Sequence, residues 1–333
     1  MLAQVWNAAI AVFARTRWSR VGLVLSACII GISIAILWRR LHHLDIHGVM
    51  RALAAKPVHQ IVGAALAIAA SYATLTGYDW FALRTIGARH VPYRIAALAS
   101  FTGYSIGHNI GATVFTGGAI RYRIYSFYGL RVLDIAKLCF VTGLTFWLGN
   151  LTMLGLGLAY VPAAASAIDR LPAWGNRTIG ITALVMILSY VIYVWRHPRV
   201  VGFERWQVTL PNGPLTLVQI LIGITDLFFC SVAMSLLIPS QPPIDFLALS
   251  VIFVFATVFG FASHAPGSLG VFDAAMLEGL GQFNREELVA GLLLFRLLYF
   301  IVPFALALTA VGARELWLAT TRAEPVARPM EWP

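Results

Sequence analysis

The sequence predicts an all-α integral membrane protein: a polytopic bundle of about seven or eight transmembrane helices with two re-entrant or interrupted helical segments. Of its 333 residues, 59% are hydrophobic and only 11% are charged, and the mean hydropathy is +0.80. Soluble domains carry about 25% charged residues, so this chain lacks the charge to cover a water-facing surface. Its apolar residues also gather in runs of about 20, the length that crosses the hydrocarbon core as a helix.

These apolar runs set the order of the predicted spans. The first run ends on Trp38, Arg39 and Arg40 without a small-residue cleavage site, so we interpret it as a membrane anchor rather than a cleavable signal peptide. We expect a cytoplasmic N-terminal segment over residues 1–20, a transmembrane domain over 21–312 and a short polar tail over 313–333. The predicted spans are Val21–Trp38, Val58–Phe81, Leu138–Tyr160, Thr178–Trp195, Leu215–Ile238, Phe246–Ala262 and Leu288–Val311.

Two further segments, Ile95–Gly118 and Phe259–Leu280, are apolar but broken near the middle by Gly, Ser, Asn, His or Pro. Unpaired backbone cannot face lipid, so we interpret both as re-entrant or interrupted helices buried in protein or lining a wet cavity. The alternative is an ordinary span whose small residues allow close helix packing. Gly117-Gly118 and Gly267-Ser268 recur at a shift of about 150 residues, a weak internal repeat of the kind on which many transporters are built.

Charged residues within predicted spans are costly and call for a reason. Asp226 lies near the centre of one span and Arg296 within another, so we expect the two to pair. Asp79 lies towards the end of the second span, and Asp273 follows the break of the second interrupted segment. For the Asp226–Arg296 pair we expect a role in substrate or proton handling, with the alternative that it fixes the register of the helices. For Asp79 the alternative is that its side chain reaches the membrane interface.

A basic cluster, Gly117-Gly118-Ala-Ile-Arg121-Tyr-Arg123, follows the first interrupted segment. The glycines permit a turn with positive φ, and two arginines could together bind a phosphodiester through charge-assisted hydrogen bonds. The alternative is the positive flank that commonly borders a membrane helix. We add Asn109, within the same interrupted segment, and Ser263, His264, Pro266 and Gly267 of the second interrupted segment to the candidate headgroup contacts.

Other functions have little support in the sequence. The net charge of +10 is spread between apolar runs, without a separate basic domain, so we expect no nucleic-acid partner. His43 and His47 are spaced by four near Asp45, but a metal site needs a further ligand, and we predict no metal and no cofactor. Catalytic and nucleotide-binding motifs are missing, so we expect no enzyme activity and no catalytic residues.

Three ordered stretches carry a resemblance to a known family: FTGYSIGHNIGATVFTGGAIRYRIYSFYGL, TLPNGPLTLVQILIGITDLFF and SHAPGSLGVFDAAML. They resemble the membrane domain of bacterial lysylphosphatidylglycerol synthase/flippase over about residues 58 to 312. The resemblance implies a helical, flippase-like bundle in the inner membrane, associated with anionic or aminoacylated phospholipids. The family's soluble aminoacyl-transferase half is not expected here, so synthesis of such a lipid is not expected either.

The resemblance also assigns positions one by one. Asp273 stands where the family more often has Glu, which shifts the charge by one methylene and puts any precise proton-handling role in doubt. The positions that match the family's motifs are Asp79, Arg121, Arg123, Asp226, Ser263, His264, Pro266, Gly267, Gly270 and Phe272.

Three functions remain open from the sequence. The first is a lipid transporter that moves a phospholipid or related amphiphile across the bacterial inner membrane. The second is a non-transporting membrane subunit or regulator of a separately encoded lipid-modifying enzyme. The third is a membrane-embedded enzyme acting on a lipid, for which a nucleophile and base pair is not apparent. Arginines in the connections favour a cytoplasmic N-terminus, although the first loop is also basic.

Overall fold

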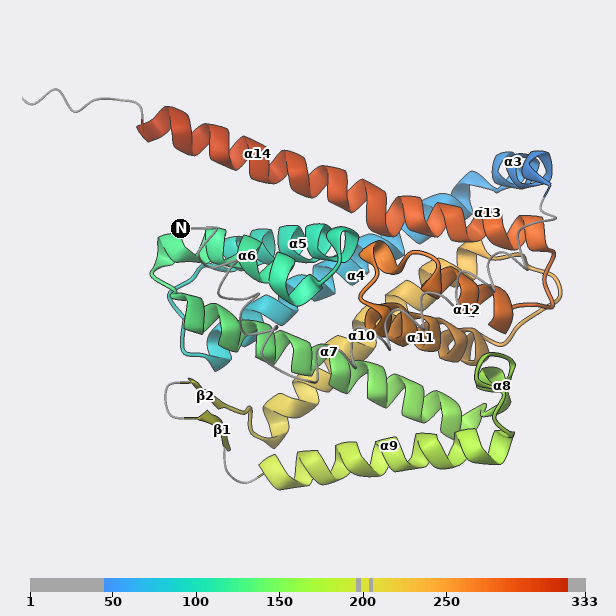
Figure 1. The fold of residues 1–333 in the computed structure, drawn as a ribbon, viewed down its shortest axis with the longest axis horizontal. Coiled ribbons are helices and arrows are strands. Elements are labelled where there is room, and N and C mark those ends of the chain that lie inside the picture. The colour runs from blue at the N-terminus through green and yellow to red at the C-terminus, as the bar shows by residue number, and fades with distance from the viewer. Residues whose placement is uncertain (1–44, 196–198, 204–205, 323–333) are drawn as a thin grey trace, which may run out of the picture.

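A computed structural model of the chain describes residues 45–195, 199–203 and 206–322, and this part is a bundle of helices with one small pair of strands (Figure 1). The helices are α3 (Ile46–Ala55), α4 (Val58–Thr85), α5 (Tyr93–Ile110), α6 (Thr113–Tyr125), α7 (Val132–Tyr160), α8 (Ala163–Asp169), α9 (Ala173–Val194), α10 (Gly213–Leu237), α11 (Phe246–Ser263), α12 (Val271–Gly279), α13 (Arg285–Arg296) and α14 (Val302–Arg322). Short turns η1 (Ser126–Tyr128), η2 (Pro266–Ser268) and η3 (Leu297–Ile301) join some of them, and η3 has π-helical geometry.

Six helical stretches in the described part are long and apolar enough to cross a membrane. The all-α polytopic prediction is therefore confirmed, whereas the predicted span Val21–Trp38 lies outside the described residues. The stretches are Val58–Thr85, Val132–Tyr160, Ala173–Val194, Gly213–Leu237, Phe246–Ser263 and Arg285–Leu316.

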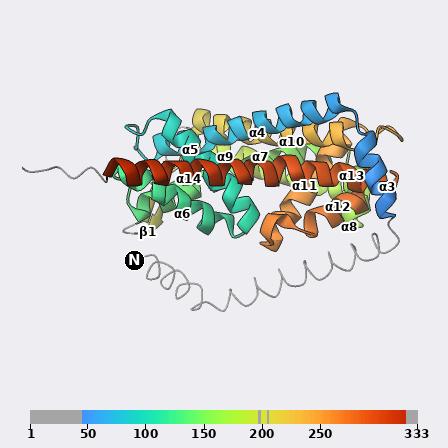
Figure 2. The ribbon, with the colours of Figure 1, turned by 90° about the horizontal axis from the view of Figure 1, so that it is seen from above.

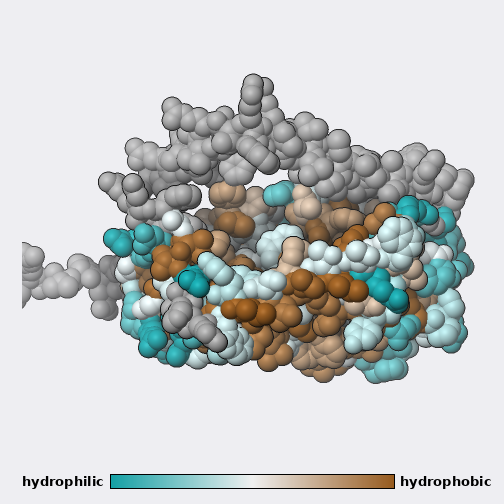
Figure 3. All heavy atoms as spheres, turned by 90° about the horizontal axis from the view of Figure 1, so that it is seen from below, coloured by the Kyte–Doolittle hydropathy of each residue, from teal (hydrophilic) through white to brown (hydrophobic). Residues whose placement is uncertain are grey.

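The surface of the bundle is apolar around its middle and hydrophilic at both ends. Figure 3 shows this apolar band between hydrophilic flanks on one face of the molecule. Leu66, Leu188 and Ile192 are more than half exposed, whereas Ser71, Ser100 and Gln219 are fully buried. A bundle with leucines outside and polar groups inside is suited to a lipid surrounding, because polar side chains are satisfied only within the protein.

Two helical hairpins enter the bundle from opposite ends. Helices α5 and α6 form one at the left of Figure 1, and α11 and α12 form the other at the right; Figure 2 shows the same separation. Their tips, at Gly111–Ala112 and at His264–Gly270, point towards each other. The first hairpin follows the long helix α4, and the second follows the long helix α10.

Long helices cross closely behind the hairpins, and small residues permit the approach. A Cβ atom added to Gly149 of α7 would lie 2.5 Å from the Cα atom of Gly223 in α10. Next to this crossing, Gln219 Nε2 donates to Thr145 Oγ1 over 2.9 Å. Small residues and interhelical hydrogen bonds are the usual means of association between helices in membranes, where lipid removes the hydrophobic drive.

Two features differ from the predicted elements. Residues Val200–Phe203 and Trp206–Thr209 form an antiparallel pair of strands, β1 and β2, with Val200 opposite Thr209. Both segments are rich in β-branched and aromatic residues, which favour strands. Helix α14 also runs past residue 312 to Arg322, so the first part of the predicted polar tail is helical.

Candidate functional site

The tips of the two hairpins contact each other between the two ends of the bundle. Gly111 has φ +85° and Gly267 has φ +58°, in the left-handed region where glycine avoids the strain of a side chain. A Cβ atom on Gly111 would lie 3.2 Å from both the His264 carbonyl oxygen and Pro266 Cα. The helices are thus interrupted where their backbones meet. Within a membrane, interrupted backbone is tolerated only where it is buried in protein or lines a water-filled cavity.

Arg121 and Asp79 form a buried ion pair behind the first hairpin. The guanidinium donates from Nη2 to Asp79 Oδ1 over 2.7 Å and from Nε to Oδ2 over 2.8 Å. The Tyr125 hydroxyl donates to Oδ2 over 2.9 Å, and the guanidinium lies 4.5 Å from the centre of the Tyr104 ring. Arg121 is 2% exposed and Asp79 is fully buried, so each charge depends on the other.

The glycines of the basic cluster serve packing rather than a turn. Gly117 and Gly118 lie inside α6 without positive φ, so of the two uses that glycine allows here, a turn and a close backbone approach, the structure has the close approach. A Cβ atom on Gly117 would lie 2.9 Å from the Gly103 carbonyl oxygen and 3.1 Å from Arg121 Nη1. Glycine at this position leaves room for both the neighbouring helix α5 and the guanidinium.

Arg296 pairs with Asp273 at the second hairpin. Its Nη2 donates to Asp273 Oδ2 over 2.5 Å, and its Nη1 donates to the Gly267 carbonyl over 3.1 Å. Asp273 Oδ2 also accepts from the Gly270 amide at the start of α12. Arg296 therefore holds both the break and the helix that follows it, and the predicted pairing of Arg296 with Asp226 is wrong.

Asp226 lies instead at the contact between α10 and α4. It is 5% exposed, and Ser71 Oγ donates to its Oδ1 over 2.5 Å. Ser71 Oγ also lies 3.2 Å from Cys230 Sγ. Within residues 45–322 as described, Asp226 forms no ion pair, and a buried carboxylate without a basic partner is costly enough to call for a function.

Aromatic side chains that sequence reasoning missed lie beside the tips. The His108 ring stacks on Tyr299 at 6.2 Å between ring centres and meets Phe261 edge-on at 5.6 Å. Tyr299 belongs to the π-helical turn η3, whose carbonyls accept from neighbouring helices: Tyr72 Oη donates to Tyr299 O, and Asn109 Nδ2 donates to Phe300 O. A single π-helical turn has no sequence signature but often marks a functional position. His108, an ionisable residue within an interrupted segment, is the one feature of the sequence that could have indicated this aromatic group.

The remaining candidates around the second tip have distinct positions. Ser263 is buried, donates to the Gly260 carbonyl and accepts from the Ala265 amide, so it secures the end of α11. His264 and Pro266 are exposed at the break. In the described segments, no three His, Cys, Asp or Glu side chains gather as a metal site would require.

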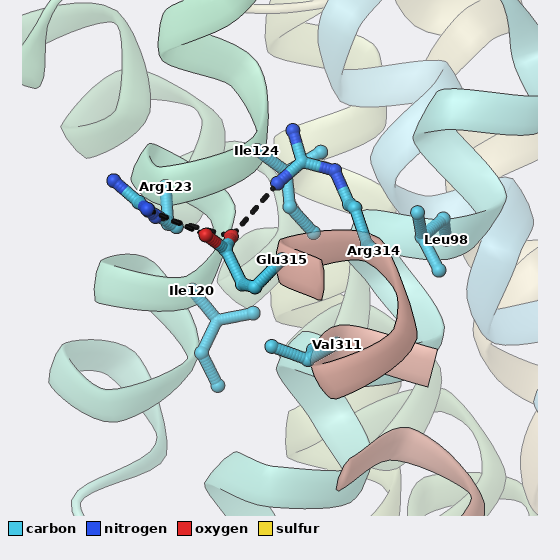
Figure 4. A pocket seen from close by; sticks show the side chains of 7 residues that line it. All are labelled: Leu98, Ile120, Arg123, Ile124, Val311, Arg314 and Glu315. Carbon is cyan, nitrogen blue, oxygen red and sulfur yellow. Dashed lines mark hydrogen bonds and ion pairs between the residues drawn. The ribbon is translucent and has the colours of Figure 1, made fainter. Parts of the chain in front are cut away.

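Arg123 lies away from Arg121, on the outer side of α6. It donates to Glu315 of α14 from Nη2 over 2.6 Å and from Nε over 3.2 Å. Figure 4 shows it above a small pocket between α5, α6 and α14. The two arginines of the cluster therefore do not converge on one anion, because residues two apart on a helix face different sides.

Comparison with known proteins places the chain among bacterial membrane proteins. No family model matches it. It is 28% identical over 306 residues to an uncharacterized protein of Synechocystis, covering 90% of this chain and 95% of that protein. It is 26% identical over 253 residues to the inner membrane protein YbhN of Escherichia coli, covering 72% and 76% of the two chains.

A third relative is named as a lipid-modifying enzyme. It is 27% identical over 220 residues to the phosphatidylglycerol lysyltransferase of Staphylococcus aureus. The match covers 66% of this chain but only 24% of that enzyme, namely its membrane part. The predicted resemblance to the lysylphosphatidylglycerol synthase/flippase membrane domain is thereby confirmed, and the relatives support a multi-pass protein of the bacterial inner membrane.

Proposed function

We propose that this protein is a flippase-like transporter that moves a phospholipid or a related amphiphile across the bacterial inner membrane. The observation that carries the proposal is the contact of two helix breaks, Gly111 against His264 and Pro266, between the two ends of the bundle. The hairpins that bear these breaks enter from opposite ends. Transporters commonly place their substrate sites at such discontinuous helices near the middle of the membrane.

The polar groups near the tips have separate roles in this proposal. Asp226 and His108 offer hydrogen bonding to a headgroup that passes the tips, and the Arg296–Asp273 pair holds the second break in place. The Arg121–Asp79 pair fixes α6 against α4. Acyl chains stay in the surrounding lipid, so only the headgroup needs a polar route.

Phosphatidylglycerol and its aminoacylated form are the first lipids to test, because one relative is named as a phosphatidylglycerol lysyltransferase. That relative also motivates a second candidate function. Most of the enzyme lies outside its match to this chain, so an enzyme encoded separately could act together with this membrane domain. In that case the chain is a non-transporting subunit or regulator.

The test is translocation of headgroup-labelled lipids in proteoliposomes, with and without an imposed proton gradient. We expect wild-type protein to accelerate translocation over protein-free vesicles. Asp226→Asn keeps an oxygen that accepts from Ser71 but removes the charge, and we expect it to slow translocation about tenfold, equivalent to about 1.4 kcal/mol of barrier. Asp245→Asn is the matched control, because Asp245 caps α11 and Asn caps helices equally well.

Each outcome separates the candidates. No acceleration with any anionic or aminoacylated lipid would contradict transport and favour the partner-subunit function. Acceleration that is equal in wild type and Asp226→Asn would retain transport but remove Asp226 from the route.

A further inference from the structure

Three charged side chains from two helices meet at one end of the bundle. Arg123 of α6 and Arg314 of α14 both bind the Glu315 carboxylate, Arg123 through two hydrogen bonds and Arg314 over 3.1 Å. The cluster therefore holds two positive charges around one negative charge. Figure 4 shows both guanidinium groups directed at the same carboxylate.

An apolar pocket lies directly beside this cluster. The charged side chains form its polar edge, and aliphatic side chains from three helices form the rest. Arg314 is fixed by the ring of Phe127, which lies 4.8 Å from its guanidinium carbon. The aliphatic residues are Leu98 of α5, Ile120 and Ile124 of α6, and Val311 of α14.

The surroundings of the pocket favour an anion. At the same end of the molecule, Arg89 is exposed in the connection between α4 and α5, and Arg84 and Arg94 are exposed at the adjoining ends of these two helices. Exposed basic residues at the end of a membrane bundle are attracted to the anionic lipid surface. An amphipathic ligand with a negative headgroup matches the pocket in both charge and polarity.

We propose that this pocket binds the phosphate ester of an anionic phospholipid, with the phosphate in place of the Glu315 carboxylate between Arg123 and Arg314. The first acyl carbons of the same lipid then contact the aliphatic side chains. Arginine binds phosphate through paired N–H donors, and phosphate offers more acceptor oxygens than a carboxylate. Glu315 thus acts as an internal competitor, and its displacement releases α14 from α6.

This site does not depend on the proposed transport function, since it lies apart from the hairpin tips. Binding can be measured on purified full-length protein in detergent, by native mass spectrometry with short-chain phosphatidylglycerol. We expect Arg123→Gln with Arg314→Gln to weaken binding about tenfold, equivalent to about 1.4 kcal/mol. We expect Glu315→Gln, which removes the competing charge, to strengthen it.

The control is Arg131→Gln, because Arg131 is exposed at the same end and pairs with Asp134, away from the pocket. We expect it to leave lipid affinity unchanged. Equal weakening by Arg131→Gln would overturn the site in favour of general attraction to basic charge, and unchanged affinity in the double arginine variant would overturn it outright. If that double variant fails to fold, weaker or unchanged binding by Glu315→Gln overturns it instead. If glycerol phosphate displaced the lipid with the same affinity as the lipid itself, the acyl chains would contribute nothing to binding. That result would overturn the apolar part of the proposed site.

Discussion

Arg121 and Asp79 are the most deeply buried ion pair in the described part of the chain. Two charges at this depth lose their hydration, and hydrogen bonds from Tyr125 and between the pair compensate for that loss. Removing one partner leaves the other charge buried and alone. Replacing both by apolar side chains removes the problem.

We therefore expect Arg121→Met or Asp79→Leu alone to lower the free energy of unfolding by about 3–5 kcal/mol. The double variant should lose less than either single variant, because no unpaired charge remains. Thermal unfolding in detergent measures the difference. Arg131→Gln, which removes an exposed pair, should change stability by less than about 1 kcal/mol. Additive losses in the double variant would show that the two charges are not coupled.

The sequence identified the charged residues of the site but not their partners. Burial of Asp226 and Arg296 followed from their apolar neighbours, yet the predicted pair between them is wrong. Arg296 reaches the first turn of α12 and the carbonyl of Gly267, whereas Asp226 faces Ser71 on α4. Position along a span gives the depth of a side chain, but its direction around the bundle depends on how the helices pack.

At the scale of elements, small residues decide where the long helices meet. The Gly149 and Gly223 backbones are in contact, and no side chain fits between them. The crossing joins α7 to α10, and α10 in turn packs along α4. This core of long helices supports both hairpins.

We expect Gly149→Ala to destabilise the protein, because its Cβ would lie 2.5 Å from Gly223 Cα and one helix must move. Overpacking of this kind costs about 1–3 kcal/mol. Gly143→Ala on the same helix is the matched control: its Cβ meets nothing within 4 Å, and alanine favours helix over glycine by about 1 kcal/mol. Thermal unfolding in detergent should separate the two, and equal stability would contradict a close crossing.

The elements were predictable to different degrees. Hydropathy located the spans, because each must bury its backbone in a helix of membrane length. Glycine, proline and polar residues indicated the breaks at Gly111 and Gly267. The strands β1 and β2 were not predicted, although Val200, Val201 and Val208 favour strands, because four-residue strands leave no long apolar run in the sequence. The π-helical turn η3 has no pattern to find.

In the whole molecule, the proposed lipid transport depends on the contact between two hairpins that enter from opposite ends. The hairpins pack against the long helices α4 and α7, and Figure 3 shows an apolar band on one face of the bundle. In the proposed transport function, relative movement of the two hairpins exposes the tips to either side of the membrane in turn. Lipid movement should therefore be sensitive to the fit of one tip against the other.

The most direct test compares Gly111→Ala with Gly87→Ala in the lipid translocation assay. Both glycines have positive φ, +85° and +86°, so alanine brings backbone strain of about 1–3 kcal/mol at both, and Gly111, with ψ −179°, lies in a region that is nearly restricted to glycine. Only at Gly111 does the new methyl group press on the other hairpin, 3.2 Å from Pro266 Cα, whereas at Gly87 it meets nothing within 4 Å. If contact between the tips is needed for transport, Gly111→Ala translocates lipid more slowly than wild type and Gly87→Ala translocates it at the wild-type rate, with both proteins folded. Equal rates in the two variants would contradict a role for the contact between the tips.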